Sequence, residues 1–269
     1  MLKHLVKYEW KATSRILLPV FGGVLLLALI NRLLWVGHGA QLSTVDGMAG
    51  LVQFLAMTAY ILFMCAAFII TFVLLLQRFY KSLLGDEGYL MFTLPVTPAQ
   101  NIWAKTIIAT IMTVLSGVAG VLSVLIMASN AQFWAQCSQI FGEGFRMLFS
   151  NAHFPIFALE GVLLFIMSTL ASILFLYLCI AIGHLAKRHR VAAALGAYFG
   201  LSLIGQWLLG VTLFTSGDSG MFHWLGNLNL QPIPAVHLIL WLLIVFTTIC
   251  TAVAFYFTRY ILTRRLNLE

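Results

Sequence analysis

The sequence predicts an all-α integral membrane protein in which residues 1–269 form a single transmembrane domain with six membrane-spanning helices. Hydrophobic residues make up 62% of the chain and charged residues only 9%, whereas a soluble domain carries about 25% charged residues. Six runs of mainly apolar residues are each long enough to cross about 30 Å of hydrocarbon as a helix. These runs are continuous rather than alternating, which excludes the pattern of a membrane β-barrel.

Residues 1–15 are expected to form an amphipathic helix in the membrane interface, ahead of the first span. Lysines recur there every four residues and so share one helical face, where they can meet anionic lipid headgroups. The residues that define this interfacial helix are Lys3, Lys7, Trp10 and Lys11. A cleaved signal peptide is the disfavoured alternative, because the basic region is long and the following run ends in Asn-Arg-Leu-Leu-Trp, without a small-residue cleavage site.

The six spans follow in order, separated by shorter polar or aromatic segments. Their expected bounds are about 16–36, 52–77, 102–129, 158–185, 191–214 and 235–258. Pro19 falls near the start of the first span, where proline is tolerated and can set the angle to the interfacial helix. Residues 130–157, between the third and fourth spans, are rich in aromatic side chains and are expected to include a further interfacial helix.

The distribution of Lys and Arg gives the expected orientation. Of the 15 Lys and Arg residues, all except Arg32 and Arg146 fall on one side, which holds both termini and the loops after the second and fourth spans. Positive residues accumulate on the cytoplasmic side of multi-pass membrane proteins. Both termini and residues 78–101 are therefore expected in the cytoplasm. The same bias explains the net charge of +7 without a nucleic-acid partner.

Sequence motifs for catalysis and metal binding are missing. The chain has no GxxxxGK(S/T) motif for a P-loop ATPase, and neither HExxH nor GxSxG. Its four cysteines form no CxxC or Cys/His spacing. His184 and His189 flank the basic cluster after the fourth span, and we interpret them as interfacial residues. The sequence therefore predicts no catalytic residue, no metal and no cofactor bound by this chain.

Polar and small residues in the spans point to specific contacts. Glu160 is the one carboxylate near the inside of a span, and an intramembrane acid is a functional candidate by default. Pro155 precedes it closely, which favours the outer headgroup level and leaves its role open. Arg32 lies similarly near the outer end of the first span, where it can snorkel. A stripe of small residues in the fifth span predicts close packing against a helix of the same or another chain. The stripe is Ala192, Gly196 and Gly200.

Residues 78–101 combine acids, glycines, prolines and aromatic side chains between two long apolar runs. We expect a short helix at the cytoplasmic surface, with Tyr80 and Leu84 among its apolar contacts. Asp86 and Glu87 are the only close pair of acids in the sequence. Short exposed helices with apolar anchors and charges suit docking on a groove of another protein. A solvated loop that merely joins two spans is the alternative.

The order of these features resembles the permease subunits of bacterial ABC-2 type transporters, particularly those of Gram-positive bacteria. The resemblance covers essentially the whole chain and is most specific in the run Gly85-Asp-Glu-Gly-Tyr-Leu-Met-Phe-Thr-Leu-Pro95. It implies a coupling helix within 78–101 that meets an ATP-binding subunit, and it makes the N-terminal amphipathic helix an elbow helix. The implied contact residues are Tyr80, Lys81, Leu83, Leu84, Gly85, Asp86, Glu87, Gly88, Tyr89 and Phe92.

The resemblance also implies two separate ATP-binding subunits, which carry ATP and Mg, and two permease chains as a homodimer or heterodimer in the bacterial cytoplasmic membrane. No large folded extracellular domain separates the fifth and sixth spans, which favours the simpler exporters. The implied function is alternating-access export of an amphipathic substrate (a peptide, a lipid or a drug). The alternatives are a stand-alone secondary transporter or channel, without a partner ATPase, and a membrane enzyme, which would need a polar catalytic cluster near one interface.

Overall fold

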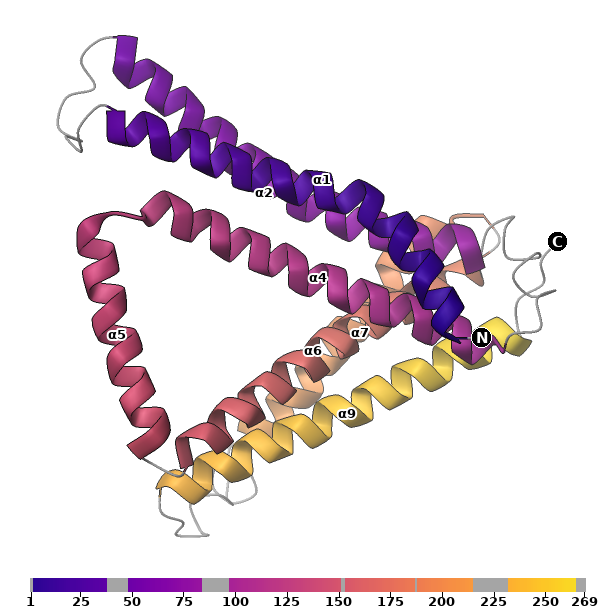
Figure 1. Cartoon of the computed structure of the whole chain (residues 1–269). Helices are drawn as coiled ribbons and strands as arrows, with labels where there is room; N and C mark the ends of the chain where they lie inside the picture. The colour runs from indigo at the N-terminus through magenta and orange to yellow at the C-terminus, as the bar shows by residue number, and fades with distance from the viewer. Residues whose placement is uncertain are drawn as a thin grey trace. The chain divides into compact units, whose positions relative to one another are not determined.

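The computed structural model describes residues 2–37, 48–83, 97–150, 153–186, 188–214 and 232–264, and every regular element in these ranges is an α-helix (Figure 1). The helices are α1 (Leu2–Gly37), α2 (Met48–Leu83), α4 (Pro98–Ala128), α5 (Ala131–Ser150), α6 (His153–His184), α7 (Arg190–Phe214) and α9 (Pro232–Arg264). The predicted all-α class is therefore confirmed for the described part of the chain.

Five of the described helices are long and apolar enough to cross a membrane, namely α1, α2, α4, α6 and α9. Each contains a candidate span of 31 to 33 residues, whereas about 20 apolar residues suffice for a crossing. These helices indicate a multi-pass membrane protein. α7 occupies the position of the expected fifth span at 191–214 but is not among the five, so a sixth crossing stays a prediction.

The N-terminal segment differs from the sequence prediction. The sequence predicts a separate interfacial helix over residues 1–15, whereas α1 is one continuous helix of 36 residues with Pro19 inside it. A proline inside a helix removes one hydrogen bond and bends the helix without always ending it. Figure 1 shows α1 bent toward its N-terminal end. Residues 2–18 contain no glycine or proline that would end the helix earlier, so the segment predicted to be interfacial is the first part of α1 and not an element of its own.

The chain divides into two compact units. Unit 1 comprises Met1–Arg78 and Trp103–Arg146, and unit 2 comprises Phe79–Ile102 and Met147–Glu269. In unit 1, α1 and α2 lie side by side (Figure 1). The buried core of unit 1 includes Leu17, Phe21, Ile108, Met112 and Ala119 between α1 and α4, and Val24, Ala28, Tyr60 and Ala67 between α1 and α2. Since lipid tails are as apolar as leucine, close packing rather than removal from water holds such helices together.

Hydrogen bonds between helices cross the apolar core of unit 1. The hydroxyl oxygens of Tyr60 and Ser123 are 2.8 Å apart, and both side chains are buried. The Asn31 Nδ2 group donates to the Ala56 carbonyl oxygen at 3.1 Å, which joins α1 to α2. Bonds of this kind contribute roughly 0.6 kcal/mol on average between membrane helices. Their main effect is to favour one axial alignment of the packed helices over alignments in which the polar groups would not meet.

In unit 2, α6 packs against both α9 and α7. α6 and α9 lie side by side and run in the same direction (Figure 1). α6 and α7 approach so closely at Gly183 that an added Cβ would lie 2.5 Å from the Ala194 Cβ and 2.6 Å from the Ala194 backbone. A side chain at position 183 would have to move the backbone of α7, so this approach requires glycine.

α5 confirms that residues 130–157 contain a helix. Asn130 caps its N-terminus, because the Phe133 backbone N–H donates to Asn130 Oδ1 at 2.6 Å. The sequence of α5 is the most amphipathic among the described helices. Such a helix is suited to a membrane interface, and its location there stays a prediction.

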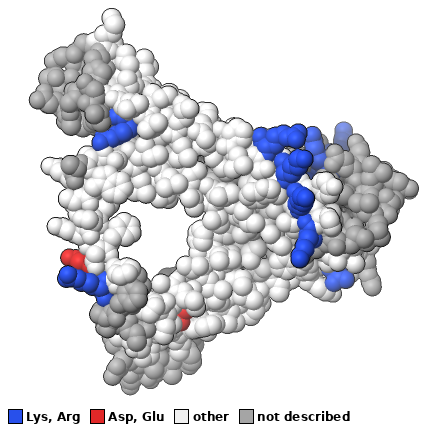
Figure 2. Space-filling model, in the orientation of Figure 1, with Lys and Arg blue, Asp and Glu red and all other residues white. Residues whose placement is uncertain are grey.

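The surface of the described helices is largely apolar. Large side chains such as Leu33, Phe54 and Phe165 are exposed. Figure 2 shows Lys and Arg gathered in a few places on the visible face, and nearly all of the remaining described surface there is uncharged. Extended apolar patches are rare on proteins in water, whereas hydrocarbon is their natural solvent. The surface therefore agrees with the membrane class that the composition predicts.

Candidate functional site

Three charged side chains from three helices of unit 1 meet in a cluster that we call the charged junction: Glu9 of α1, Arg78 of α2 and Lys105 of α4. Glu9 Oε2 accepts a hydrogen bond from the Arg78 guanidinium at 3.1 Å. Glu9 Oε1 accepts a second from the Lys105 ammonium group. The side chains of Lys105, Glu9 and Arg78 are 5%, 18% and 28% exposed. One carboxylate thus serves two helices, with one oxygen for each.

The charged junction depends on Glu9. Burying an ammonium group costs several kcal/mol unless an anion accompanies it, so Glu9 is the group that makes the burial of Lys105 tolerable. Arg78 lies within the last two turns of α2, and Lys105 lies within the first three turns of α4. Glu9 is therefore bonded to both helices that flank residues 84–96 in the sequence.

The structure describes only the beginning of the predicted contact loop. Tyr80, Lys81 and Leu83 lie in the last turn of α2. The other predicted contact residues lie outside the described residues, namely Leu84, Gly85, Asp86, Glu87, Gly88, Tyr89 and Phe92. The coupling helix and its contact with an ATP-binding subunit therefore stay predictions.

Aromatic contacts join the end of α2 to α6 within unit 2. Phe79 stacks on Tyr177 with ring centroids 3.8 Å apart, and both side chains are buried. The Tyr80 ring meets the His184 ring edge to face at 6.0 Å. Tyr80 is half-buried, whereas Lys81 is exposed. Of these two predicted contact residues, Tyr80 already packs on a helix of its own chain, and Lys81 is the more accessible to another protein.

The residues that define the predicted interfacial helix lie in the first three turns of α1. Lys3, Lys7, Trp10 and Lys11 are all exposed. The four-residue spacing of the lysines places them on one face of α1, as the sequence predicts. Their exposure leaves them free to meet an anionic surface, and their contact with lipid headgroups stays a prediction.

The two glycines of the small-residue stripe in α7 have open space beside them among the described residues. Ala192 and Gly196 are exposed, and a Cβ added at Gly196 or Gly200 would meet no described atom within 4 Å. The close approach of α7 to α6 instead uses Ala194, which faces Gly183. The face beside the stripe therefore makes the described contact with α6, and packing of the stripe itself against a helix of this chain stays a prediction. A contact with another chain stays a prediction.

Glu160 is paired with a histidine from another helix of unit 2. Its side chain is 2% exposed, and its Oε2 and Oε1 atoms lie 2.8 and 3.0 Å from Nδ1 of His237 on α9. Phe157 stacks on the His237 ring with centroids 3.9 Å apart, and the His153 ring lies 5.9 Å away. The Nε2 atom of His237 is buried without a hydrogen-bond partner among the described residues. The role that the sequence leaves open for Glu160 therefore includes joining α6 to α9.

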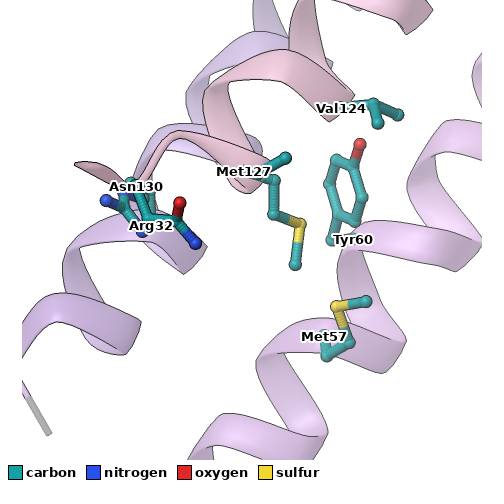
Figure 3. Close-up of a pocket in the computed structure, with 7 residues that line it drawn as sticks. Arg32, Met57, Tyr60, Val124, Met127 and Asn130 are labelled. Atoms are coloured by element: carbon teal, nitrogen blue, oxygen red, sulfur yellow. The ribbon is translucent and has the colours of Figure 1, made fainter. Parts of the chain in front are cut away.

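A pocket of about 380 Å³ opens in unit 1 between α1, α2 and α4 (Figure 3). It is lined by Arg32, Met57, Tyr60, Val124, Met127, Ala128 and Asn130. Figure 3 shows the Arg32 and Asn130 side chains together at one side of the view, with Met57 and Tyr60 at the other. The pocket therefore has one polar end with a cation and a larger apolar part.

Sequence reasoning missed the partners in these arrangements. Glu9 is the only acid in the first 45 residues, and a lone acid in a basic segment could have signalled a pairing role. The partner of Glu160 gave no such signal, because His237 lies 77 positions away in another helix. The sequence also contains no signal for the pocket, since Arg32 near the end of a span is explained equally well by snorkelling toward the headgroups.

The described residues hold no group of three or more His, Cys, Asp or Glu side chains arranged to bind a metal ion. Comparison with known proteins adds no assignment: no family model, curated protein or solved structure matches the chain. The candidate functional features are thus those of the chain itself, namely the charged junction, the Glu160–His237 pair and the pocket at Arg32.

Proposed function

We propose that the chain is the permease subunit of an ATP-binding cassette exporter in the bacterial cytoplasmic membrane, with both termini in the cytoplasm. Two ATP-binding subunits, which hold ATP and Mg, and a second permease chain complete the transporter. The exported molecule is amphipathic. The resemblance of residues 78–101 to a coupling region and the distribution of Lys and Arg support this proposal.

The structural observation that carries the proposal is the double bonding of Glu9 in the charged junction. A docking loop can drive transport only if its displacement reaches the spans. Arg78 precedes residues 84–96 and Lys105 follows them, and both bind the same carboxylate. A push on the loop would therefore displace α1, α2 and α4 together. In alternating access, closure of the ATP-binding subunits supplies that push, and the spans switch the side to which the substrate site opens.

The combined substitution Asp86→Lys and Glu87→Lys tests the docking site in the complex co-expressed with its ATP-binding subunits. We expect normal membrane insertion but loss of the ATP-binding subunits on purification, since two acids opposite the partner become two cations. Glu143→Lys is the matched control, because Glu143 is an exposed acid on α5, which is predicted on the outer side. Normal co-purification and ATP-driven transport by the double variant would rule out this docking site.

A proton-coupled secondary transporter is the second candidate, and the Glu160–His237 pair is the observation that favours it. Ionisable side chains that pair inside membrane spans are typical of proton relays. Reconstitution in vesicles separates the two functions. An exporter of the first kind needs the ATP-binding subunits and ATP, whereas a secondary transporter works as a single chain and stops when the proton gradient is collapsed.

A further inference from the structure

We propose that the pocket in unit 1 binds the phosphate-bearing head of an anionic phospholipid, and that Arg32 recognises the phosphate. The binding concerns this chain alone, so it does not rest on the proposed export function. Among the described residues, the pocket holds a cation with no paired anion, a second hydrogen-bond donor, and an apolar wall that continues onto the outer surface of the helices.

Arg32 carries a charge in an apolar setting. It lies within the candidate span of α1, and Leu29 and Leu33 beside it are 51% and 64% exposed. The ion pairs of the described residues do not include Arg32. A guanidinium at membrane depth is costly and is normally paired or drawn toward the headgroups. A lipid phosphate supplies the missing anion, and its oxygens match the fork of the guanidinium.

Asn130 adds a second donor at the polar end of the pocket. Its Oδ1 accepts the Phe133 backbone N–H at 2.6 Å and so caps α5, which leaves Nδ2 as the free group of the amide. Asn130 and Arg32 line the same pocket, and Figure 3 draws both side chains on the same side of the view. Because an ionised phosphodiester only accepts hydrogen bonds, a guanidinium and an amide NH₂ that line one pocket are complementary to it.

The apolar part of the pocket suits the start of an acyl chain. Met57 and Met127 have flexible side chains that adapt to irregular apolar ligands. The Tyr60 hydroxyl is already bonded to Ser123 at 2.8 Å, so its ring acts as an apolar wall. A volume of about 380 Å³ is at the small end of ligand pockets, which span about 300–1,000 Å³. The pocket therefore holds the head and the first part of the chain only.

The remainder of the acyl chain has an apolar path outside the pocket. Val121 and Leu125 lie within one turn of Val124 on α4 and are 61% and 39% exposed. Such a path favours a lipid in the bilayer over a soluble phosphate. A soluble anion has no apolar chain, so it would make no contact with these exposed apolar side chains and would not cover them.

Native mass spectrometry of the purified full-length chain tests the proposal with three probes: phosphatidylglycerol, phosphatidylcholine with the same acyl chains, and glycerol 3-phosphate. We expect the wild-type chain to retain phosphatidylglycerol in preference to phosphatidylcholine, because the choline ammonium offsets the phosphate charge beside a cation, and not to retain glycerol 3-phosphate. Arg32→Gln should weaken phosphatidylglycerol binding about tenfold or more, since a charge-assisted bond is lost. Arg32→Lys should bind phosphatidylglycerol more weakly than the wild type and more tightly than Arg32→Gln, because lysine keeps the charge but lacks the forked donors of the guanidinium.

Arg15→Gln is the matched control, because Arg15 is an exposed arginine on the same helix and does not line the pocket. Val124→Trp gives a second test that leaves the cation in place: it fills the apolar part and should also reduce phosphatidylglycerol retention. Equal retention of the two lipids by the wild type, or retention unchanged in Arg32→Gln, would overturn the proposal. Binding of glycerol 3-phosphate as tight as that of the lipid would overturn the assignment to a lipid.

Discussion

Glu9 and Arg78 are 69 positions apart in the sequence, yet the Glu9 carboxylate lies 3.1 Å from the Arg78 guanidinium. The same carboxylate binds Lys105, which is 96 positions from Glu9. Two cations therefore share one anion where α1, α2 and α4 meet. Because Glu9 is the one carboxylate that pairs with both cations, its loss should destabilise the charged junction more than the loss of Arg78 or Lys105 would.

Replacing Glu9 by Gln should destabilise the chain by about 3 kcal/mol, because the buried Lys105 loses its counter-charge. The measurement is the thermal unfolding of the purified chain in detergent. Glu9→Gln combined with Lys105→Met should recover most of the loss, since an apolar side chain of similar length needs no anion. An unchanged unfolding midpoint in Glu9→Gln would show that the charged junction does not hold these helices together.

The Glu160–His237 pair should show strong coupling between α6 and α9. We expect Glu160→Ala and His237→Ala to be non-additive by about 2 kcal/mol in a double-mutant cycle, as for other side chains in direct contact. Glu143→Ala, which removes an exposed acid from α5, should leave the unfolding midpoint unchanged. If the two substitutions add, the side chains contribute to stability independently and the pair does not join the helices.

Gly183 and Gly196 should respond differently to the same substitution. Gly183→Leu would force the added side chain into the Ala194 backbone, 2.6 Å from the new Cβ, and should lower the unfolding midpoint strongly. Gly196→Leu meets no described atom within 4 Å and should leave the chain folded. If the stripe on α7 is a contact between chains, Gly196→Leu should also weaken dimer formation, measured by size-exclusion chromatography with light scattering. Equal effects of the two substitutions on folding would contradict the assigned packing of α7.

The hydrogen bond between Tyr60 and Ser123 should make a modest contribution. Tyr60→Phe removes only the hydroxyl and should cost about 0.6 kcal/mol, with about 1.7 kcal/mol as the upper end for membrane helices. Ser123→Ala should cost a similar amount, and the double variant little more than either one. Additive losses in unfolding experiments would mean that the two hydroxyls contribute through their contacts with the Met64 sulfur and the Gly120 carbonyl oxygen rather than through each other.

The sequence predicted the helices better than their partners, and the residues show why. Crossing a membrane depends on the summed hydropathy of one continuous segment, so α1, α2, α4, α6 and α9 could be predicted locally. The continuity of α1 through Pro19 could not be read locally, because a proline can either end or bend a helix.

The side-chain pairs at the candidate sites depend on the tertiary packing of helices that are far apart in the sequence, so the local sequence could not predict them. The sequence indicated Glu160 as a candidate because a carboxylate within a span is rare, but it could not predict that His237 of another helix is its partner. It placed Glu9, Arg78 and Lys105 on one side of the membrane from the Lys and Arg distribution, yet it could not show that one carboxylate binds both cations. Asp86 and Glu87 lie outside the described residues, and their proposed partner belongs to another chain.

Purification of the chain from its native membrane is the most direct test of the proposed function. The bound proteins would be identified by mass spectrometry, and ATP hydrolysis by the complex would be measured. We predict two P-loop ATP-binding subunits for every two permease chains, and ATP hydrolysis that is lost from the complex when Asp86 and Glu87 are both replaced by Lys. A chain that purifies without any ATP-binding protein and transports without ATP would contradict the account.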